Sequence, residues 1–363
     1  MDEPKIDPVI IIGVLNWGLG HATRCVPIIR ELEKCGFTTV MASDGAALDY
    51  LRTEFPHLPA EEIPAYGIHY SNRVGALLSV GLQFPKLWRA ARLENSILQR
   101  LVERYRPVGI ISDNRLGFYH PQLPSVYITH QLKLMLPFAR ELISSLHHHF
   151  IKRYDACWIP DNKGRQSLTG EMISSIDPGV PLYFLGPLSR FKRPVSDSGV
   201  KRFKTCVILS GPEPQRSILE KILWQQLRAL SGEHLLIRGL NKPAQQLGHS
   251  PNVEVINFAG SEEIAHFIGQ AELVISRSGY SSLMDYYYLG NRALLIPTPG
   301  QPEQEYLARY MLSRGWFYYA AQEALDLQKD VVQALEYPGF SGLPRKEKDL
   351  SDLFGLFEGK RKG

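Results

Sequence analysis

The sequence is poor in the features that mark secreted, membrane-spanning and metal-binding proteins. Its four cysteines are scattered, without the spacing of a disulfide framework or a zinc site, and are typical of reduced core thiols in a cytoplasmic protein. The longest apolar run near the start, residues 9–12, is far shorter than a membrane span. The acidic residues 1–4 lead directly into that run, which predicts the absence of a secretory signal.

Charge of either sign is present without a large excess. The net charge of +4 fits an anionic substrate or an anionic membrane surface and is specific for neither. No aromatic–basic nucleic-acid motif, metal-ligand spacing or internal repeat occurs, so we expect no nucleic-acid partner and no metal. A length of 363 residues with 44% hydrophobic and 21% charged residues predicts a globular protein of two domains.

The first half of the chain alternates short apolar runs with helical patterns. Buried strands are expected at residues 9–14, 37–43, 108–112 and 125–129. A glycine-bearing turn follows the first strand, and a helix is expected over residues 22–34. This alternation is typical of a doubly wound, Rossmann-like α/β domain, which we assign to residues 1–188.

A loop and a helix are expected after the second strand of this half. Residues 64–84 are expected to form an irregular loop, and residues 86–106 an amphipathic helix with several arginines. Such a basic helix is compatible with contact to a membrane surface. A solvated outer helix of an α/β domain has the same pattern, and we favour that interpretation.

Three polar residues follow predicted strands of the first half. His21 comes directly after the turn that contains Gly18 and Gly20, whereas Asp113 and His130 end the third and fourth strands. Because the carboxyl ends of parallel strands meet at one edge of the sheet, we expect these three side chains to converge. A histidine oriented by a carboxylate is suited to general base catalysis. The alternatives are a helix-capping role for His21 and a turn-forming role for Asp113.

The second half restarts the same pattern. A segment rich in Lys, Arg, Ser and Pro, residues 189–202, is expected to be a linker. Residues 203–340 are expected to form a second Rossmann-like domain, and residues 341–363 a terminal helix. The repeated pattern predicts an α/β protein with two doubly wound domains.

A turn and a loop in this half indicate a nucleotide site. The turn Arg277-Ser278-Gly279 lies between a buried strand and a helix, where free amides and the helix dipole favour a diphosphate. Asp285 lies two turns into that helix, and its carboxylate could accept hydrogen bonds from a ribose diol. The next strand leads into a Pro/Gly-rich loop that carries Glu303 and Gln304.

At these residues the chain resembles the GT-B glycosyltransferases, and in particular the MurG-type branch that uses UDP-N-acetylglucosamine. The matching residues are the turn 277–279, Asp285, the pair Glu303-Gln304 and the glycine turn 18–21 that ends in histidine. Leu307 and Ala308 stand where the family has an asparagine. The resemblance implies two Rossmann-like domains that face a cleft, with the final helix returning to the first domain. The first domain, with its loop at residues 64–84, would then lie on the acceptor side.

The resemblance also implies roles for individual residues. The Gly211 loop would face the phosphates, but it holds two prolines that donate no amide, so Arg216 or Arg238 is expected to add charge. Phe258 and Ile264 match the family's positions beside the nucleobase. The expected catalytic residues are His21, Asp113 and His130. The expected donor-binding residues are Gly18, Gly20, Gly211, Arg216, Arg238, Phe258, Ile264, Arg277, Ser278, Gly279, Ser282, Asp285, Glu303 and Gln304.

The activity implied is that of an inverting, metal-independent hexosyltransferase. It would move a sugar, N-acetylglucosamine or a related hexose, from a UDP-sugar co-substrate to an acceptor hydroxyl without a cofactor. The basic helix and the family's habits suggest a lipid-linked or cell-envelope acceptor and a cytoplasmic location at the inner face of the membrane. The alternatives are a UDP-N-acetylglucosamine 2-epimerase and a non-catalytic sugar-nucleotide-binding protein, which the altered Gly211 loop would suit.

Overall fold

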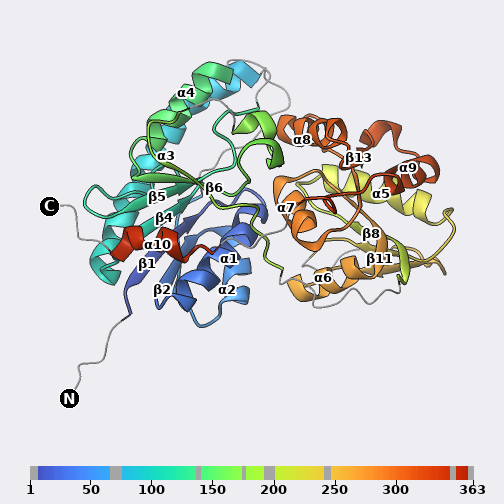
Figure 1. Ribbon diagram of the computed structural model, residues 1–363, viewed down its shortest axis with the longest axis horizontal. Helices are drawn as coiled ribbons and strands as arrows, with labels where there is room; N and C mark the ends of the chain where they lie inside the picture. Colours follow the sequence, from blue (N-terminus) through green and yellow to red (C-terminus); the bar gives the residue numbers. More distant parts are fainter. Residues whose placement is uncertain are drawn as a thin grey trace. The chain divides into compact units, whose positions relative to one another are not determined.

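The chain forms two compact units, each built on a parallel β-sheet. The computed structural model describes residues 7–65, 76–135, 140–173, 177–191, 201–240, 247–343 and 349–358. Unit 1 consists of residues 1–188 and 347–363, and unit 2 of residues 189–346 (Figure 1). The chain therefore leaves unit 1 once and returns to it at its end.

The sheet of unit 1 has seven parallel strands in the order β3-β2-β1-β4-β5-β6-β7. Its strands are β1 (Val9–Val14), β2 (Thr38–Ser43), β3 (Ala60–Glu62), β4 (Gly109–Asp113), β5 (Ser125–Ile128), β6 (Ala156–Ile159) and β7 (Leu182–Phe184). The direction of progression reverses between β1 and β4. Open α/β sheets bind ligands beyond the carboxyl ends of the strands at such a reversal.

The helices of unit 1 include one that starts earlier than the sequence suggests. They are α1 (Gly20–Lys34), α2 (Gly45–Glu54), α3 (Ala76–Tyr105), α4 (Arg140–Ile151) and α10 (Ser351–Glu358). The expectation of an irregular loop at residues 64–84 is wrong for residues 76–84, which are helical, while residues 66–75 lie outside the described residues. Gly81 and Pro85 resemble helix breakers, but a proline removes one backbone hydrogen bond and can be accommodated within a long helix.

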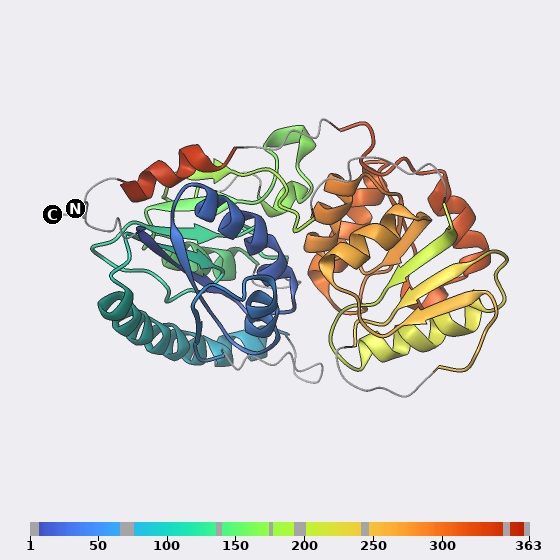
Figure 2. The same ribbon diagram turned by 90° about the horizontal axis from the view of Figure 1, so that it is seen from below.

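Helices α3 and α10 cover opposite faces of the unit 1 sheet (Figure 2). Leu98 of α3 packs in the cluster that contains Ile110 of β4. The neighbouring Gly109 leaves no room for a Cβ beside the ring of Phe357 on α10. Because adjacent strand residues point to opposite faces, these contacts place α10 across the sheet from α3. Phe354 of α10 adds an edge contact to the ring of Phe37 and a tilted contact to the ring of Trp158.

The sheet of unit 2 has six parallel strands in the order β10-β9-β8-β11-β12-β13. Its strands are β8 (Phe203–Ile208), β9 (His234–Ile237), β10 (Val253–Ile256), β11 (Ala271–Ser276), β12 (Ala293–Leu295) and β13 (Tyr318–Tyr319). The progression reverses between β8 and β11, so unit 2 has its own expected ligand-binding edge beyond these strands.

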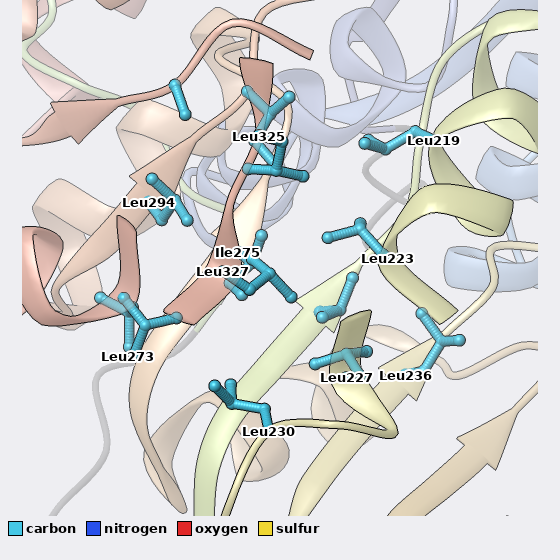
Figure 3. Close-up of a cluster of buried hydrophobic side chains, with 14 of the residues drawn as sticks. Leu219, Leu223, Leu227, Leu230, Leu236, Leu273, Ile275, Leu294, Leu325 and Leu327 are labelled. Carbon is cyan, nitrogen blue, oxygen red and sulfur yellow. The ribbon is translucent and has the colours of Figure 1, made fainter. Parts of the chain in front are cut away.

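Leucines of one helix hold the core of unit 2 together. The helices are α5 (Gln215–Leu227), α6 (Ser261–Gly269), α7 (Tyr280–Leu289), α8 (Pro302–Ser313) and α9 (Leu327–Leu335). Leu219, Leu223 and Leu227 of α5 face Leu273 and Ile275 of β11 (Figure 3). The spacing of four residues places the three leucines on one helix face, and burial of each contributes about 1.5–3 kcal/mol.

Among the helices of the described residues, none is long and apolar enough to cross a membrane.

Candidate functional site

The switch point of unit 1 brings His21 to Asp113. Gly18 adopts a positive φ of 76° in the loop after β1, a conformation that favours glycine, and Gly20 is the first residue of α1. The Nδ1 atom of His21 then lies 2.6 Å from Oδ1 of Asp113 at the end of β4. Asp113 is fully buried, so its carboxylate is held in place by the packed interior of the domain.

Arg24 joins the same cluster, although the sequence interpretation did not include it. Its Nε donates to Oδ2 of Asp113 at 2.6 Å, its Nη2 contacts Oδ1 of the same carboxylate, and the side chain is 3% exposed. Nη1 lies 2.8 Å from Nδ1 of His130, and Nη2 lies 2.9 Å from Nδ1 of His21. The structure thus brings the three predicted catalytic residues together around one arginine. In the sequence, the signal for Arg24 was its position three residues after His21, which puts both side chains on one face of the helix.

The pKa values of His21 and Asp113 are both lowered in this cluster, for different reasons. Burial, followed by the charge of Arg24, lowers the pKa of His21 from its ordinary 6.5, although Asp113 acts against them. Burial would raise the pKa of Asp113, but Arg24 and His21 together hold it well below its usual range. His21 is therefore a neutral imidazole beside a permanent carboxylate at neutral pH.

The imidazole of His21 has one nitrogen left for chemistry. Nδ1 is occupied by Asp113, and no hydrogen bond to Nε2 occurs within the described part of the chain. The side chain of His21 retains 12% exposure. A neutral, oriented imidazole with an accessible Nε2 can accept a proton from a hydroxyl group.

Two large apolar side chains flank the glycine of this loop. Trp17 is 48% exposed and Leu19 is 40% exposed, on either side of Gly18. An added Cβ at Gly18 would meet no atom within 4 Å. The loop that leads to His21 therefore presents exposed apolar surface.

In unit 2 the predicted turn after β11 is tied to the predicted loop after β12. Gly279 caps the amino end of α7, and the preceding Ser278 donates through Oγ to the carbonyl of Gln304 at 2.8 Å. The side-chain oxygen of Gln304 accepts from the amide of Thr298 at 2.9 Å. Glu303 is half-buried in the first turn of α8. The structure therefore assembles the residues expected to bind phosphate and sugar.

Thr298 is a member of this group that the sequence interpretation missed. It is 4% exposed, and its hydroxyl has no hydrogen-bond partner within the described residues. A Cβ added to Gly211 would lie 4.0 Å from that hydroxyl, so the hydroxyl adjoins the Gly211 loop. An unpaired buried hydroxyl costs about 1–3 kcal/mol, which a ligand oxygen would recover. A polar residue between two prolines at a strand end was the only signal in the sequence.

Arg277, the first residue of the same turn, has a buried side chain. It is 1% exposed, and its guanidinium donates to the carbonyls of Gln215 at 2.9 Å and Pro297 at 3.2 Å and to Oε1 of Gln322 at 2.8 Å. Burial lowers its pKa to about 10, so it stays charged at neutral pH. No carboxylate of the described residues forms an ion pair with it. Pro297 and Gln322 also line a pocket of about 380 Å³.

Arg216 and Arg238 are buried side by side around Glu220. Nη1 of Arg216 lies 2.7 Å from Oε2 of Glu220, and Nη2 of Arg238 lies 2.8 Å from Oε1. Arg216 also contacts the exposed Glu213 at 2.6 Å. Much of the charge expected to compensate for the sparse Gly211 loop is therefore balanced by carboxylates, whereas the guanidinium of Arg277 has carbonyl and amide oxygens as its partners.

Asp285 lies in α7 with two partners from the segment that opens unit 2. Ser189 donates to its Oδ1 at 2.7 Å, and Nε of Arg190 lies 3.8 Å from Oδ2. Burial raises the pKa of Asp285 to about 6, against the opposing effects of these neighbours. Ser282, one turn earlier in the helix, is half-buried. The ribose-binding role of Asp285 stays a prediction.

The two residues expected beside the nucleobase differ in exposure. Phe258, after β10, is 54% exposed, so it is not a core residue. Ile264 of α6 is 9% exposed. An exposed aromatic ring near the carboxyl end of a strand is available for stacking on a base.

A family model matches unit 2. Residues 209–339 match the glycosyltransferase family 28 C-terminal domain. An uncharacterized glycosyltransferase of Methanosarcina acetivorans is 25% identical to the chain over 324 residues, which cover 85% of this chain and 84% of the relative. The family description and the relative's name both indicate a glycosyltransferase.

Solved structures resemble both units. Spinosyn rhamnosyltransferase SpnG complexed with thymidine diphosphate aligns with a TM-score of 0.59 and 16% identity, covering 92% of this chain and 93% of SpnG. MurG of Acinetobacter baumannii aligns with a TM-score of 0.57 and 12% identity, covering 96% of this chain and 99% of MurG. These likenesses confirm the predicted fold class of two Rossmann-like domains, as in GT-B glycosyltransferases. These likenesses do not assign the chain to the MurG-type branch, because SpnG and MurG align with it about equally well.

Proposed function

We propose that the protein is an inverting glycosyltransferase that moves a hexose from a nucleoside diphosphate sugar to an acceptor hydroxyl. The observation that carries the proposal is the pair of His21 and Asp113, 2.6 Å apart at the start of α1. Because Asp113 is fully buried and Nε2 of His21 is available, the pair has the geometry of an oriented general base. The match of unit 2 to a glycosyltransferase domain supports the same assignment.

The reaction proposed is a single displacement. Nε2 of His21 takes the proton of the acceptor hydroxyl as its oxygen bonds to the anomeric carbon on the face opposite the diphosphate. The bond from that carbon to the diphosphate oxygen breaks, and the diphosphate leaves with the electron pair. Asp113 stabilises the imidazolium that forms on His21.

Unit 2 is proposed to bind the donor. The amino end of α7 at Gly279, the hydroxyls of Ser278 and Thr298 and the buried charge of Arg277 would hold the diphosphate. Since these groups supply donors and positive charge, the proposed mechanism uses neither metal nor cofactor. Asp285 would accept from the ribose diol and Phe258 would stack on the base, while Glu303 and Gln304 would contact the sugar.

The donor is proposed to be a UDP-sugar, on the resemblance to enzymes that use UDP-N-acetylglucosamine. The thymidine diphosphate complex of SpnG makes dTDP-sugars the first comparison. Calorimetric titration of the full chain with UDP, dTDP, GDP and CMP tests the choice. The proposal expects UDP to bind at least about tenfold more tightly than the others, a difference of about 1.4 kcal/mol. Equal affinity for all four would contradict it.

The acceptor is proposed to carry an apolar group beside its hydroxyl. The exposed Trp17 and Leu19 support this, because they flank the loop that leads to His21. A lipid-linked or cell-envelope glycan at the inner face of the membrane is the acceptor class that the resemblance suggests. Binding of the protein to anionic lipid vesicles, compared with neutral ones, tests the proposed membrane contact.

Product analysis tests the reaction itself. The protein is incubated with a UDP-hexose and a panel of alkyl, aryl and lipid-linked glycosides, and the products are separated by mass and by anomeric NMR signals. An inverted glycoside linked to an acceptor supports the proposal. An epimerised donor would assign the protein to the epimerases. Tight UDP binding without conversion of any donor would indicate a sugar-nucleotide-binding protein.

A further inference from the structure

Arg24 contacts both histidines of the unit 1 cluster through atoms that can only donate. A guanidinium has five N–H donors and no acceptor, and it stays protonated in proteins. Its Nη1 lies 2.8 Å from Nδ1 of His130, at full hydrogen-bond distance. Its Nη2 lies 2.9 Å from Nδ1 of His21. The contact with Arg24 constrains where His130 carries its proton, whereas His21 contacts both Arg24 and Asp113.

For His130 the constraint has one solution. Nδ1 must offer its lone pair to Nη1 of Arg24, because a proton on Nδ1 would set two donors against each other. His130 then carries its proton on Nε2. The side-chain amide nitrogen of Gln131 lies 3.2 Å from Nε2 of His130. Flipping this amide, which exchanges its nitrogen and oxygen, lets the oxygen accept a hydrogen bond from the Nε2–H group. The guanidinium has no such alternative orientation.

For His21 a carboxylate decides the matter. Oδ1 of Asp113 lies 2.6 Å from Nδ1, closer than Nη2 of Arg24 at 2.9 Å. A carboxylate cannot donate, so the contact requires the proton on Nδ1 of His21. The 2.9 Å contact between Nη2 of Arg24 and Nδ1 of His21 is then the approach of two donors that share the acceptor Oδ1 of Asp113, and it is not a hydrogen bond. Arg24 keeps its hydrogen bonds to the carboxylate through Nε and Nη2. The lone pair of His21 is therefore on Nε2.

We propose that Arg24 is a positioning residue that gives the two histidines opposite roles, His21 as the proton acceptor and His130 as a hydrogen-bond donor. Two imidazoles in one cluster would otherwise be interchangeable candidates for the base. Arg24 occupies the only lone pair that His130 has to offer, and it holds the carboxylate that orients His21. The assignment of roles in catalysis rests on the proposed function, whereas the proton positions do not.

The proton positions are measured directly by NMR. The full chain is labelled with ¹⁵N-histidine, and two-bond ¹H–¹⁵N correlations at neutral pH distinguish the two neutral tautomers of each ring. Signals are assigned with the variants His21→Gln and His130→Gln. The proposal expects a proton on Nδ1 of His21 and on Nε2 of His130. A proton on Nδ1 of His130, or on Nε2 of His21, in the unmodified protein would overturn it.

The variant Arg24→Met removes the donor and keeps a long apolar side chain. The proposal expects His130 to lose its single tautomer and show exchange between the two, while the reference signals of His266 in unit 2 stay unchanged. An unaltered His130 pattern in a folded Arg24→Met protein would overturn the role of Arg24. The spectrum of the unmodified protein decides the proton positions even where the variant does not fold.

Turnover provides the functional arm of the test. Glutamine places an amide N–H near the position of Nε2 and cannot act as a base. The proposal expects the loss of kcat in His21→Gln to exceed that in His130→Gln by at least about tenfold, since a general base contributes about 10²–10⁴. The reverse order would overturn the division of roles. Absence of any transfer in the unmodified protein would instead contradict the proposed function, with the tautomers still measurable.

Discussion

The Nδ1 atom of His21 lies 2.6 Å from Oδ1 of Asp113, although 92 positions separate the two residues in the chain. The contact exists because β1 and β4 are adjacent parallel strands whose carboxyl ends meet at the switch point. It places a neutral imidazole against a buried carboxylate, with Nε2 left for a substrate. Two of the predictions that follow depend on this pair.

His21→Ala is expected to lower kcat by at least about a hundredfold, since general base catalysis contributes about 10²–10⁴. The affinity for UDP is expected to stay within about twofold, because the proposed donor residues belong to unit 2. Steady-state kinetics with calorimetry separates the two effects. Turnover close to that of the unmodified protein would remove His21 from the mechanism.

The value of kcat/KM is expected to stay high as the pH falls to 6.5. Burial and Arg24 lower the pKa of His21 from 6.5, and the base acts only when unprotonated, so the acid limb should fall below pH 6.5. The groups that face His21 are Arg24, Asp113 and His130. Asp113→Asn removes the group that raises this pKa, so it should move the limb further down while lowering kcat. An acid limb at or above the ordinary histidine value would be inconsistent with this site.

Nucleotide binding is expected to depend on the charge of Asp285, whose pKa burial raises to about 6. A carboxyl one unit below its pKa is about one-tenth charged, so UDP should bind about tenfold more weakly at about pH 5 than at about pH 7. Asp285→Asn should bind UDP weakly at both values, which controls for titration of the diphosphate. Pyrophosphate binding should change little in that variant. Equal losses for UDP and pyrophosphate would contradict a ribose contact.

Thr298→Val is expected to separate stability from binding. Valine keeps the shape of threonine and removes a buried hydroxyl that lacks a partner, so the free energy of unfolding should be unchanged or higher. If the hydroxyl donates to the diphosphate, the affinity for UDP should fall about two- to tenfold, the equivalent of about 0.5–1.5 kcal/mol. Urea unfolding and calorimetry measure the two quantities. A variant that binds UDP as well as the unmodified protein would exclude Thr298 from the donor site.

Helix α10 is expected to stabilise unit 1 through its buried face. Phe357 is 4% exposed and its ring fills the space beside Gly109, so Phe357→Ala should lower the free energy of unfolding by about 3–5 kcal/mol. Leu356→Ala, at the adjacent position that is 38% exposed, is the matched control and should cost less than about 1 kcal/mol. Similar losses in the two variants would show that α10 does not dock through this face.

Most strands and turns of both units could be predicted from local patterns. The apolar runs at residues 9–14 and 108–112 correspond to β1 and β4, because fully buried parallel strands are continuously apolar. The glycine turn before His21 and the turn at Ser278-Gly279 follow from the conformations and free amides that such positions require. The start of α3 could not be predicted, since Gly81 and Pro85 looked like breakers and only long-range packing decides whether a helix tolerates them.

The sequence by itself determined the α/β class, the repeated strand–helix order and the residues at the strand ends. Only the tertiary structure decided which charges meet. Arg24 looks like an ordinary helix residue until β4 and β5 deliver Asp113 and His130 to it, and Glu220 becomes the shared partner of Arg216 and Arg238 only after β9 is in place. The physical reason is that hydrophobic periodicity is local, whereas ion pairs depend on the order of strands in the sheet, which brings distant residues within a few ångströms.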